Sequence, residues 1–370
     1  MSKAAELAAL IANVNKGSSL GNKNFIINGA MNVAQRGTSS TGISASNYYT
    51  VDRFKCTIEN TAGRLTMEQV ADGPDGFANC TKLTCTTADT SIASNEALIL
   101  HQNIEGQNVQ SLKKGTADAV PVTVSFYVKA NASATYTMEL RSGDASTNRM
   151  NSQEFSVTTS WTRVELTFVG DTSQVLDDDS NASLLCNIWL HGGSDYTGGT
   201  HTDNVWHTTN NQRVGDSQTS FFDSTSRTFF ITGWQLEIGE KATEFEHEPF
   251  ETTLHKCERY FCKSYNYSVA VGTASYFGMR GTDLEENNQG SGYREKYDLM
   301  FPVRMRNSPT VTVYDSAGTV NKCNYYISAT STAGKTFTVS AAKDTCFGGY
   351  SDRSTTIGGW RVHFAADAEI

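Results

Sequence analysis

Hydrophobic and polar residues alternate with a period of two over most of the chain from Asn24 to Ile238. Successive side chains of a β-strand point to opposite faces, so this alternation predicts strands with one buried face. The apolar members of three such strands are Val122, Val124, Phe126 and Val128; Tyr136, Met138 and Leu140; and Val164, Leu166 and Phe168. No convincing amphipathic helix appears within this span. The pattern therefore predicts an antiparallel β-sandwich.

The stretch from Phe229 to Tyr260 predicts how this sandwich ends. The alternation that begins at Phe229 is interrupted at Gly233 and resumes one residue out of phase through Trp234 to Ile238. An interruption of this kind predicts a strand with a β-bulge at the glycine. Gly239 then supplies a turn, the segment 242–249 leads out as an edge segment, and the polar residues 251–256 begin a new element. We interpret this stretch as the closing strand of one domain followed by a hinge.

A short helix is predicted at the N-terminus. Its apolar residues have the spacing of a coiled-coil seam: Ala4, Leu7, Ile11 and Val14. Ser2 is a candidate N-cap, and the pattern ends at Asn15. A helix of about 14 residues is marginal alone in water and must pack against something. It could lie on its own domain, but the linker 15–22 favours a self-associating bundle, or a peg inserted into a larger particle.

A second, smaller β region is predicted after the hinge. Alternation recurs at Val311 and Val313, at Phe337 and Val339, and at Trp360, Val362 and Phe364. Turns are expected at 316–318 and 333–335. The predicted organisation is mainly β and has three parts. These are an N-terminal helix and linker (1–21) for oligomerisation or attachment, a sandwich (22–250), and a C-terminal β domain (251–370) resembling a smaller sandwich.

A long polar loop between Trp189 and Phe221 is the candidate ligand site. Long loops inside compact domains are often functional. Aromatic rings can stack on sugar rings while carboxylates and amides bind the hydroxyl groups. The candidate glycan-binding residues are Trp206, Tyr196, His191, Asp195, Asp203 and Asn204. An equally weighted alternative is that Trp206 is a lid over the sandwich core and that the polar residues are only solvated.

Three stretches resemble the jelly-roll module of phage tail-fibre and virion proteins, which is similar to carbohydrate-binding modules. They are 24–38 with 49–54, then 104–130, and finally the Gly-x-Gln-Leu-Glu-x-Gly strand at 233–239 with the Ala-Thr-x-Phe-Glu-x-x-Pro segment at 242–249. The run 301–311 also resembles the domains that follow this sandwich in phage fibres. The resemblance covers roughly residues 22 to 260 and implies a jelly-roll sandwich. It is more specific for architecture than for a ligand.

Charge and composition narrow the classes of partner. The net charge of −9 argues against nucleic acid, because phosphate binding needs a basic surface. No apolar run is long enough to span a bilayer, and no export signal is recognised. The eight cysteines include no Cys-x-x-Cys pair. Free buried thiols are therefore expected rather than a disulfide framework.

The sequence contains no recognisable catalytic or metal-binding motif, so no cofactor, metal or catalytic residue is predicted. The segment 329–336 approaches a phosphate-binding loop, but a strand follows it where a helix is required, which favours a hairpin turn. The segment 177–181 begins like a calcium loop, but Ala182 replaces the turn glycine. Neither the histidine spacing nor the cysteines form a metal site or a placed nucleophile. A glycosidase carboxylate pair is not recognisable from sequence.

These observations predict a non-enzymatic bacteriophage virion protein. We interpret it as a tail fibre or adhesin for host attachment through surface glycan, assembled in the host cytoplasm together with other virion proteins. A homotrimer is expected from the resemblance to phage fibres. Two alternatives remain: a virion-borne glycan depolymerase, and a capsid decoration or fibre protein without a ligand. Depolymerases usually use long solenoid repeats, and none is visible in this sequence.

Overall fold

The computed structural model describes Lys3 and residues 22–144, 148–281, 294–327, 330–351 and 359–370. Contacts divide the chain into two compact units. Of the described residues, unit 1 contains 22–32, Ser39–Tyr49 and those from Phe54 to Pro249. Unit 2 contains Phe250–Ile370 and two short upstream segments, Val33–Thr38 and Thr50–Arg53. Ala4, Leu7, Ile11 and Val14, the predicted attachment and oligomerisation residues, lie outside the described part of the chain.

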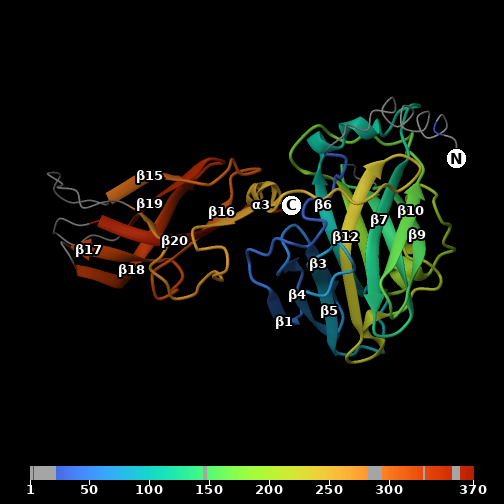
Figure 1. Cartoon of the computed structure of the whole chain (residues 1–370), viewed down its shortest axis with the longest axis horizontal. Helices are drawn as coiled ribbons and strands as arrows, with labels where there is room; N and C mark the ends of the chain where they lie inside the picture. Colours follow the sequence, from blue (N-terminus) through green and yellow to red (C-terminus); the bar gives the residue numbers. More distant parts are fainter. Residues whose placement is uncertain (1–2, 4–21, 145–147, 282–293, 328–329, 352–358) are drawn as a thin grey trace. The chain divides into compact units, whose positions relative to one another are not determined.

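Unit 1 consists of two six-stranded antiparallel sheets (Figure 1). Sheet A has the order β1 (Ser39–Ile43), β4 (Arg64–Val70), β5 (Cys80–Thr87), β12 (Thr228–Ile238), β7 (Val122–Ala130) and β10 (Thr162–Phe168). Sheet B has the order β2 (Asn47–Tyr48), β3 (Lys55–Glu59), β6 (Ala97–Glu105), β11 (Ala182–Gly192), β8 (Ala134–Ser142) and β9 (Met150–Val157). The predicted mainly β, antiparallel sandwich is confirmed.

The core of unit 1 lies between the inner faces of its two sheets. The four alternating residues of β7 from Val122 to Val128 are all buried, as the pattern predicted. Trp234 of β12 lies against Phe126, at 6.0 Å between ring centroids, and stacks on Phe54 at 5.5 Å. Full burial of each large apolar side chain stabilises the fold by about 1.5–3 kcal/mol. The two sheets are therefore held together mainly by aromatic and branched side chains.

The predicted bulge in β12 is confirmed. The pairing of β12 with β7 shifts register between Thr232 and Gln235, and Gly233 between them has φ +63°. Residues other than glycine are disfavoured in this left-handed conformation. A Cβ atom at Gly233 would also lie 2.8 Å from the Phe77 ring and 2.9 Å from the Tyr127 ring. Backbone conformation and packing thus both require glycine at this position.

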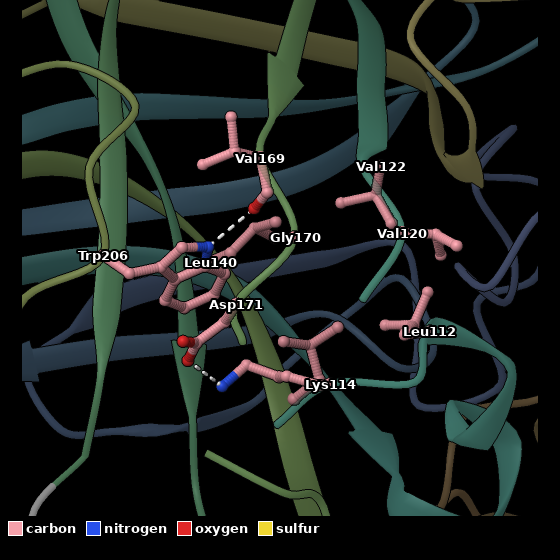
Figure 2. A pocket seen from close by; sticks show the side chains of 10 residues that line it. Leu112, Lys114, Val120, Val122, Leu140, Val169, Gly170, Asp171 and Trp206 are labelled. Atoms are coloured by element: carbon pink, nitrogen blue, oxygen red, sulfur yellow. Dashed lines mark hydrogen bonds and ion pairs between the residues drawn. The ribbon is translucent and has the colours of Figure 1, made fainter. Parts of the chain in front are cut away.

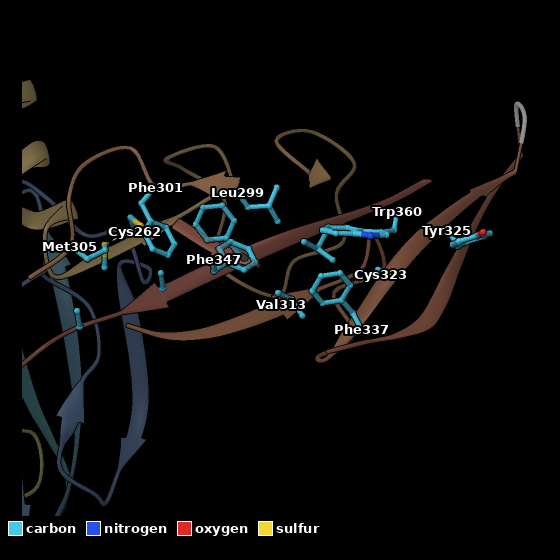
Figure 3. Close-up of a cluster of buried hydrophobic side chains, with 14 residues drawn as sticks. Cys262, Leu299, Phe301, Met305, Val313, Cys323, Tyr325, Phe337, Phe347 and Trp360 are labelled. Carbon is cyan, nitrogen blue, oxygen red and sulfur yellow. Dashed lines mark hydrogen bonds between the residues drawn. The ribbon is translucent and has the colours of Figure 1, made fainter. Parts of the chain in front are cut away.

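Unit 2 begins with the helix α3 (Phe250–Glu258), the new element expected after the hinge. Its sheet has the order β13 (Phe261–Lys263), β20 (Gly359–Asp367), β17 (Lys322–Ile327), β18 (Thr330–Ala342), β19 (Cys346–Ser351) and β15 (Arg294–Met300). The strands β14 (Arg280–Gly281) and β16 (Thr310–Tyr314) also pair with β20. Figure 3 shows Trp360, Phe337 and Val313 in its core. The alternation predicted in this region therefore does correspond to strands.

One of the two turns predicted in unit 2 is present and the other is wrong. Gly318 has φ +81° and its N–H donates to the carbonyl of Asp315 at 3.0 Å, which forms the expected turn at 316–318. At 333–335 the chain instead continues as β18. Cys323 pairs with Lys335 but Tyr325 pairs with Thr332, so β18 has one extra residue here, which forms a bulge. The glycine at 334 therefore marks a kink within a strand, a role that glycine shares with turns.

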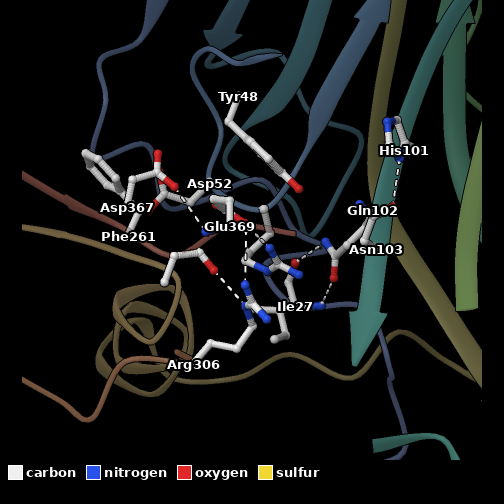
Figure 4. A network of polar contacts seen from close by, with 12 residues as sticks. Ile27, Tyr48, Asp52, His101, Gln102, Asn103, Phe261, Arg306, Asp367 and Glu369 are labelled. Atoms are coloured by element: carbon white, nitrogen blue, oxygen red, sulfur yellow. Dashed lines mark hydrogen bonds and ion pairs between the residues drawn. The ribbon is translucent and has the colours of Figure 1, made fainter. Parts of the chain in front are cut away.

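The two upstream segments of unit 2 bind its C-terminal residues through buried ion pairs (Figure 4). The Glu369 carboxylate is paired with the guanidinium groups of Arg36 and Arg53. Those two guanidinium groups lie over the Phe261 and Tyr260 rings, at 3.8 and 3.4 Å from the centroids. The predicted domain boundaries remain predictions, but residues 33–38 and 50–53 contribute to the structure of unit 2. This contribution could not be predicted from the sequence, because ion pairs between distant segments leave no local pattern.

No helix in the described part of the chain is long and apolar enough to cross a membrane.

Candidate functional site

The candidate loop connects β11 to β12 and crosses the outer face of sheet B. It begins with the short helix α2 (Ser194–Thr197). It then runs beside β9, where the backbones of His207 and Met150 exchange two hydrogen bonds. Finally it returns over β8, where the N–H of Gly215 donates to Thr137 Oγ1 at 3.0 Å. Backbone hydrogen bonds to two strands hold this loop on the sheet although it has little regular structure of its own.

Tyr196 is the predicted site residue that best fits a binding surface. It is half-buried, and its ring lies against buried Trp189 at 4.9 Å between centroids. Trp189, Ile99 and Val214 form a small apolar cluster beneath it. Burial, followed by the nearby Glu59 carboxylate, raises the pKa of the Tyr196 phenol. Tyr196 therefore presents a supported, neutral aromatic ring at the surface of sheet B.

A buried ion pair lies beside Tyr196 and supports the surface of sheet B there. Arg213 donates from Nε and Nη2 to the two carboxylate oxygens of Glu139, at 2.7 and 2.9 Å. Asn187 and Trp189 donate to the same carboxylate at 2.7 and 3.0 Å. Burial by itself would raise the pKa of Glu139, but Arg213 and these donors lower it below the ordinary value. The carboxylate therefore stays ionised and fully occupied by its partners.

Arg213 also connects this ion pair to the two aromatic rings. Its guanidinium carbon lies 4.7 Å from the Trp189 ring centroid and 5.7 Å from that of Tyr196. A cation over an aromatic face adds about 0.5–2 kcal/mol, depending on desolvation. Arg213 and Glu139 were not among the predicted residues, because pairing between β8 and a distant loop has no sequence spacing.

Asp203 and Asn204 hold the loop against sheet B. Asn204 Oδ1 accepts hydrogen bonds from the Val169 N–H at 2.9 Å and from Asn151 Nδ2 at 3.3 Å. Asp203 Oδ1 accepts from the Glu154 N–H at 3.2 Å. These polar atoms are engaged by the protein in this conformation. Their predicted glycan-binding role has no support from their contacts.

Trp206 has the contacts of a lid (Figure 2). Its indole N–H donates to the Val169 carbonyl at 2.7 Å, and the Lys114 ammonium lies 4.5 Å from its ring centroid. Together with residues such as Leu112 and Val122, the ring lines a hollow of about 20 Å³. That volume holds about one water molecule, whereas ligand pockets have about 300–1,000 Å³. The geometry favours the alternative in which Trp206 covers the core.

Lys114 and Asp171 form the polar side of this hollow. The Lys114 ammonium donates to Asp171 Oδ2 at 2.6 Å, and Arg149 Nε lies 2.9 Å from the same oxygen. Burial would raise the pKa of Asp171, but Lys114 and Arg149 lower it. Arg149 also donates to the Trp206 carbonyl at 3.2 Å. This charged cluster is thus a further support for the position of Trp206.

The remaining predicted residues differ in accessibility. Asp195 is exposed on α2 next to Tyr196. His191 is completely buried, with its ring nitrogens bound to Glu96 and Ser220. A side chain in that position does not reach a surface ligand, so the predicted glycan contact of His191 is not compatible with this conformation. Of the six predicted residues, Tyr196 and Asp195 are neighbours at the accessible surface, and Asp203 is also 60% exposed.

No metal-binding group of three or more His, Cys, Asp or Glu residues occurs among the described residues. The three histidines of the loop region 189–221 have other partners. His191 binds Glu96 and Ser220, His201 lies 3.0 Å from Ser152 Oγ, and His207 Nδ1 accepts from the Thr209 N–H at 3.2 Å. The site is therefore described by its aromatic and charged side chains alone.

The fold and site define a two-unit β protein whose larger unit is an antiparallel sandwich. No protein-family model matches the chain, and no curated protein matches it. Among solved structures it is similar to one described as "CBM4 structure and function", with 13% identity and a TM-score of 0.31 over 57% of this chain and 98% of that one. It is also similar to the family 11 carbohydrate-binding module from Clostridium thermocellum, with 10% identity and a TM-score of 0.28 over 57% and 99%.

A third similar structure is the enzymatically active domain of bacteriophage CBA120 tailspike protein 4. The identity is 12% and the TM-score 0.32, and the match covers 59% of this chain but 22% of that one. With TM-scores below 0.5, these similarities carry no argument about ligand or activity. The assignment of a function therefore depends on the residues of the site.

Proposed function

We propose that this chain is a bacteriophage virion structural protein, a tail fibre or adhesin, whose unit 1 binds host-surface glycan and does not cleave it. The observation that carries the proposal is the half-buried Tyr196 ring, supported by Trp189 and Arg213 on the outer face of sheet B. An aromatic ring of this kind provides a stacking surface for a sugar. Asp195 and Glu59 supply carboxylates near the ring, which can accept hydrogen bonds from the hydroxyl groups of the sugar.

The alternative of a glycan depolymerase needs two carboxylates that face each other across a groove. Glu139, the buried carboxylate of this face, is occupied by Arg213, Asn187 and Trp189. A carboxylate with such partners is not free to act as a nucleophile or proton donor. This contact pattern favours binding over cleavage at the Tyr196 surface. If no glycan binds there, the second alternative, a structural protein without a ligand, is favoured instead.

The binding test compares Tyr196→Ala with Tyr196→Phe. One sugar–aromatic contact is worth about 1 kcal/mol, so Tyr196→Ala should weaken glycan binding roughly fivefold per site. Tyr196→Phe retains the ring and should bind nearly as well as the wild type. Binding is measured on immobilised host-surface polysaccharide, with thermal unfolding of each variant as the control for folding. Equal binding by the wild type and a folded Tyr196→Ala variant would refute the role of this surface.

A homotrimer fixed to the virion through residues 1–21 is part of the same proposal. Weak single sites become useful in adhesion only when several copies act together. Deleting residues 1–21 should leave a folded monomer that is absent from particles, as measured by light scattering and by particle composition. If the shortened chain keeps its oligomeric state and still assembles, the contacts between copies lie in units 1 and 2. Assembly in the reducing host cytoplasm agrees with eight free thiols, seven of them buried.

A further inference from the structure

A serine, a histidine and a glutamate are hydrogen-bonded one to the next in unit 1. His191 is the residue before the last one of β11, and Glu96 immediately precedes β6. Ser220 precedes the 3₁₀ turn η4 (Phe221–Asp223). The three residues come from segments that are far apart in the chain. The fold therefore assembles the group, and no sequence motif predicts it.

The distances connect the three side chains without a gap. Ser220 Oγ lies 2.7 Å from His191 Nδ1, and His191 Nε2 lies 2.9 Å from Glu96 Oε2. The other Glu96 oxygen accepts from the Ala93 N–H at 2.8 Å, which fixes the carboxylate. The His191 and Phe222 rings are 5.4 Å apart in an edge-to-face arrangement, which fixes the imidazole. The histidine therefore has a positioned partner on each nitrogen.

One tautomer of His191 connects the three groups for proton transfer. With its hydrogen on Nε2, the imidazole donates to the Glu96 carboxylate, and Nδ1 can accept the Ser220 hydroxyl proton. The Phe222 N–H donates to Ser220 Oγ at 3.1 Å, which caps the 3₁₀ turn and fixes the position of this oxygen. The serine oxygen thus combines a base on one side with a hydrogen-bond donor on the other. This is the arrangement that activates a nucleophilic hydroxyl.

Solvent exposure increases from the buried His191 and Glu96 side chains to Ser220. The side chains of His191 and Glu96 are 0% and 4% exposed, whereas Ser220 is only half-buried. The adjoining segment 91–95 is exposed, including Ile92 at 48%. A purely structural histidine would need only that its two nitrogens be satisfied. Here the buried pair terminates at a hydroxyl close to the surface.

We propose that Ser220, His191 and Glu96 form a hydrolytic site for an acyl ester. Ser220 Oγ attacks the ester carbonyl carbon while its proton passes to His191 Nδ1, and Glu96 stabilises the resulting imidazolium. The carbon–oxygen bond to the alcohol breaks, and the proton on Nδ1 goes to the departing alkoxide. Water then attacks the acyl-serine with its proton taken by Nδ1, which releases the carboxylic acid and restores the hydroxyl. The sum is ester plus water giving acid plus alcohol, with no oxidation or reduction.

These three residues are not part of the Tyr196 surface as defined above, and they make a prediction of their own. The substrate class is an O-acyl ester, such as an acyl group on a hydroxylated polymer, and hydrolysis leaves the polymer backbone uncut. The inference therefore goes beyond glycan binding. It can fail while binding at Tyr196 is retained, and the reverse is also possible.

The test is covalent labelling of the native, full-length protein with a fluorophosphonate, which reacts with activated serines. We expect one adduct, mapped to Ser220 by peptide mass spectrometry, and no adduct in heat-unfolded protein. Hydrolysis of p-nitrophenyl acetate should be lost in Ser220→Ala. It should fall by at least about 100-fold in His191→Gln, the usual effect of losing a general base.

Ser224→Ala is the matched control. Ser224 follows the same 3₁₀ turn, is exposed, and donates only to the neighbouring Thr225 carbonyl. This variant should label and hydrolyse like the wild type. A native wild-type chain that gives no Ser220 adduct, or equal labelling before and after unfolding, would overturn the proposal. Because this readout is made on the wild type, it does not depend on the folding of any variant.

Discussion

At the scale of single residues, side-chain type did not reveal role. Tyr196 and Trp206 are both aromatic residues of the same polar loop, and both were predicted to contact a glycan. Tyr196 presents a half-buried ring at the outer face of sheet B, whereas Trp206 is tied to Val169 and Lys114 over an apolar hollow. The difference arises from what lies beneath each ring. Each role therefore predicts a different response to substitution.

Trp206→Ala should lower the free energy of unfolding of unit 1 by about 2 kcal/mol or more, because a large ring over the core is replaced by a cavity. The measurement is urea denaturation. Trp206→Phe keeps most of the ring but loses the hydrogen bond to the Val169 carbonyl, and should cost about 1 kcal/mol. Unchanged stability together with reduced cell adsorption would instead identify Trp206 as a binding residue.

His101 should make unit 1 less stable in mild acid. Burial, followed by the nearby Lys55 ammonium, lowers its pKa from 6.5 to about 4. The unfolded chain binds a proton near pH 6.5, which the folded unit does not accept until about pH 4. The contribution of His101 is therefore complete above pH 6.5 and is lost as the pH falls toward 4, by up to about 3 kcal/mol.

The check is the pH dependence of the urea midpoint for His101→Gln. This variant should flatten the slope between pH 4 and 6.5, even if the loss of the Thr57 hydrogen bond lowers stability at neutral pH. His247→Gln, a change at an exposed histidine of unit 1, is the matched control for the substitution itself. A slope that is unchanged in His101→Gln would show that other groups cause the acid sensitivity.

At the scale of elements, a glycine indicated that the chain is irregular at that point, but it did not always indicate whether the irregularity is a bulge or a turn. The break in alternation at Gly233 was correctly interpreted as a bulge, because the apolar residues resumed out of phase after it. The glycine at 334 was wrongly interpreted as a turn. Its neighbours are small and polar on both sides, so they carried no phase that could distinguish a kinked strand from a hairpin.

Gly233→Ala should destabilise unit 1 by more than the equivalent change at Gly42. Both glycines have nearly the same backbone conformation, φ +63° and +64°. An added Cβ at Gly42 meets nothing within 4 Å, whereas at Gly233 it meets the Phe77 and Tyr127 rings. Gly42→Ala should therefore cost about 1–2 kcal/mol for the left-handed conformation alone. The excess at Gly233, measured by thermal unfolding, is the packing cost, and equal losses would show that the rings move aside.

At the scale of the whole molecule, unit 2 is not a continuous segment of the chain. Val33–Thr38 and Thr50–Arg53 supply partners to its C-terminal residues. Gln35 Nε2 donates to the Phe261 carbonyl at 2.7 Å, and Arg36 and Arg53 pair with Glu369. A domain boundary drawn from composition alone separates these partners. This makes a fragment experiment informative.

Residues 250–370 expressed alone should be much less stable than unit 2 in the full chain. The Glu369 carboxylate is 4% exposed and would lose both arginines, and an unpaired buried charge costs about 3–5 kcal/mol. The measurement is thermal unfolding of the fragment with and without an added peptide of residues 33–53, which should restore stability. Arg53→Met in the full chain is the matched single-site test. A fragment as stable as the intact unit would show that the ion pairs contribute little.

The sequence by itself determined the parts of this protein that depend on local periodicity. Alternation established the strands of both units, the antiparallel sandwich and the bulge at Gly233, because burial of one face imposes a period of two. It also placed Tyr196 and Asp195 in an exposed loop. Only the tertiary structure decided that Trp206 covers the core, that His191 meets Ser220 and Glu96, and that Arg36 and Arg53 complete unit 2. These contacts join residues far apart in the chain, and their partners are chosen by three-dimensional packing, which leaves no trace in local spacing.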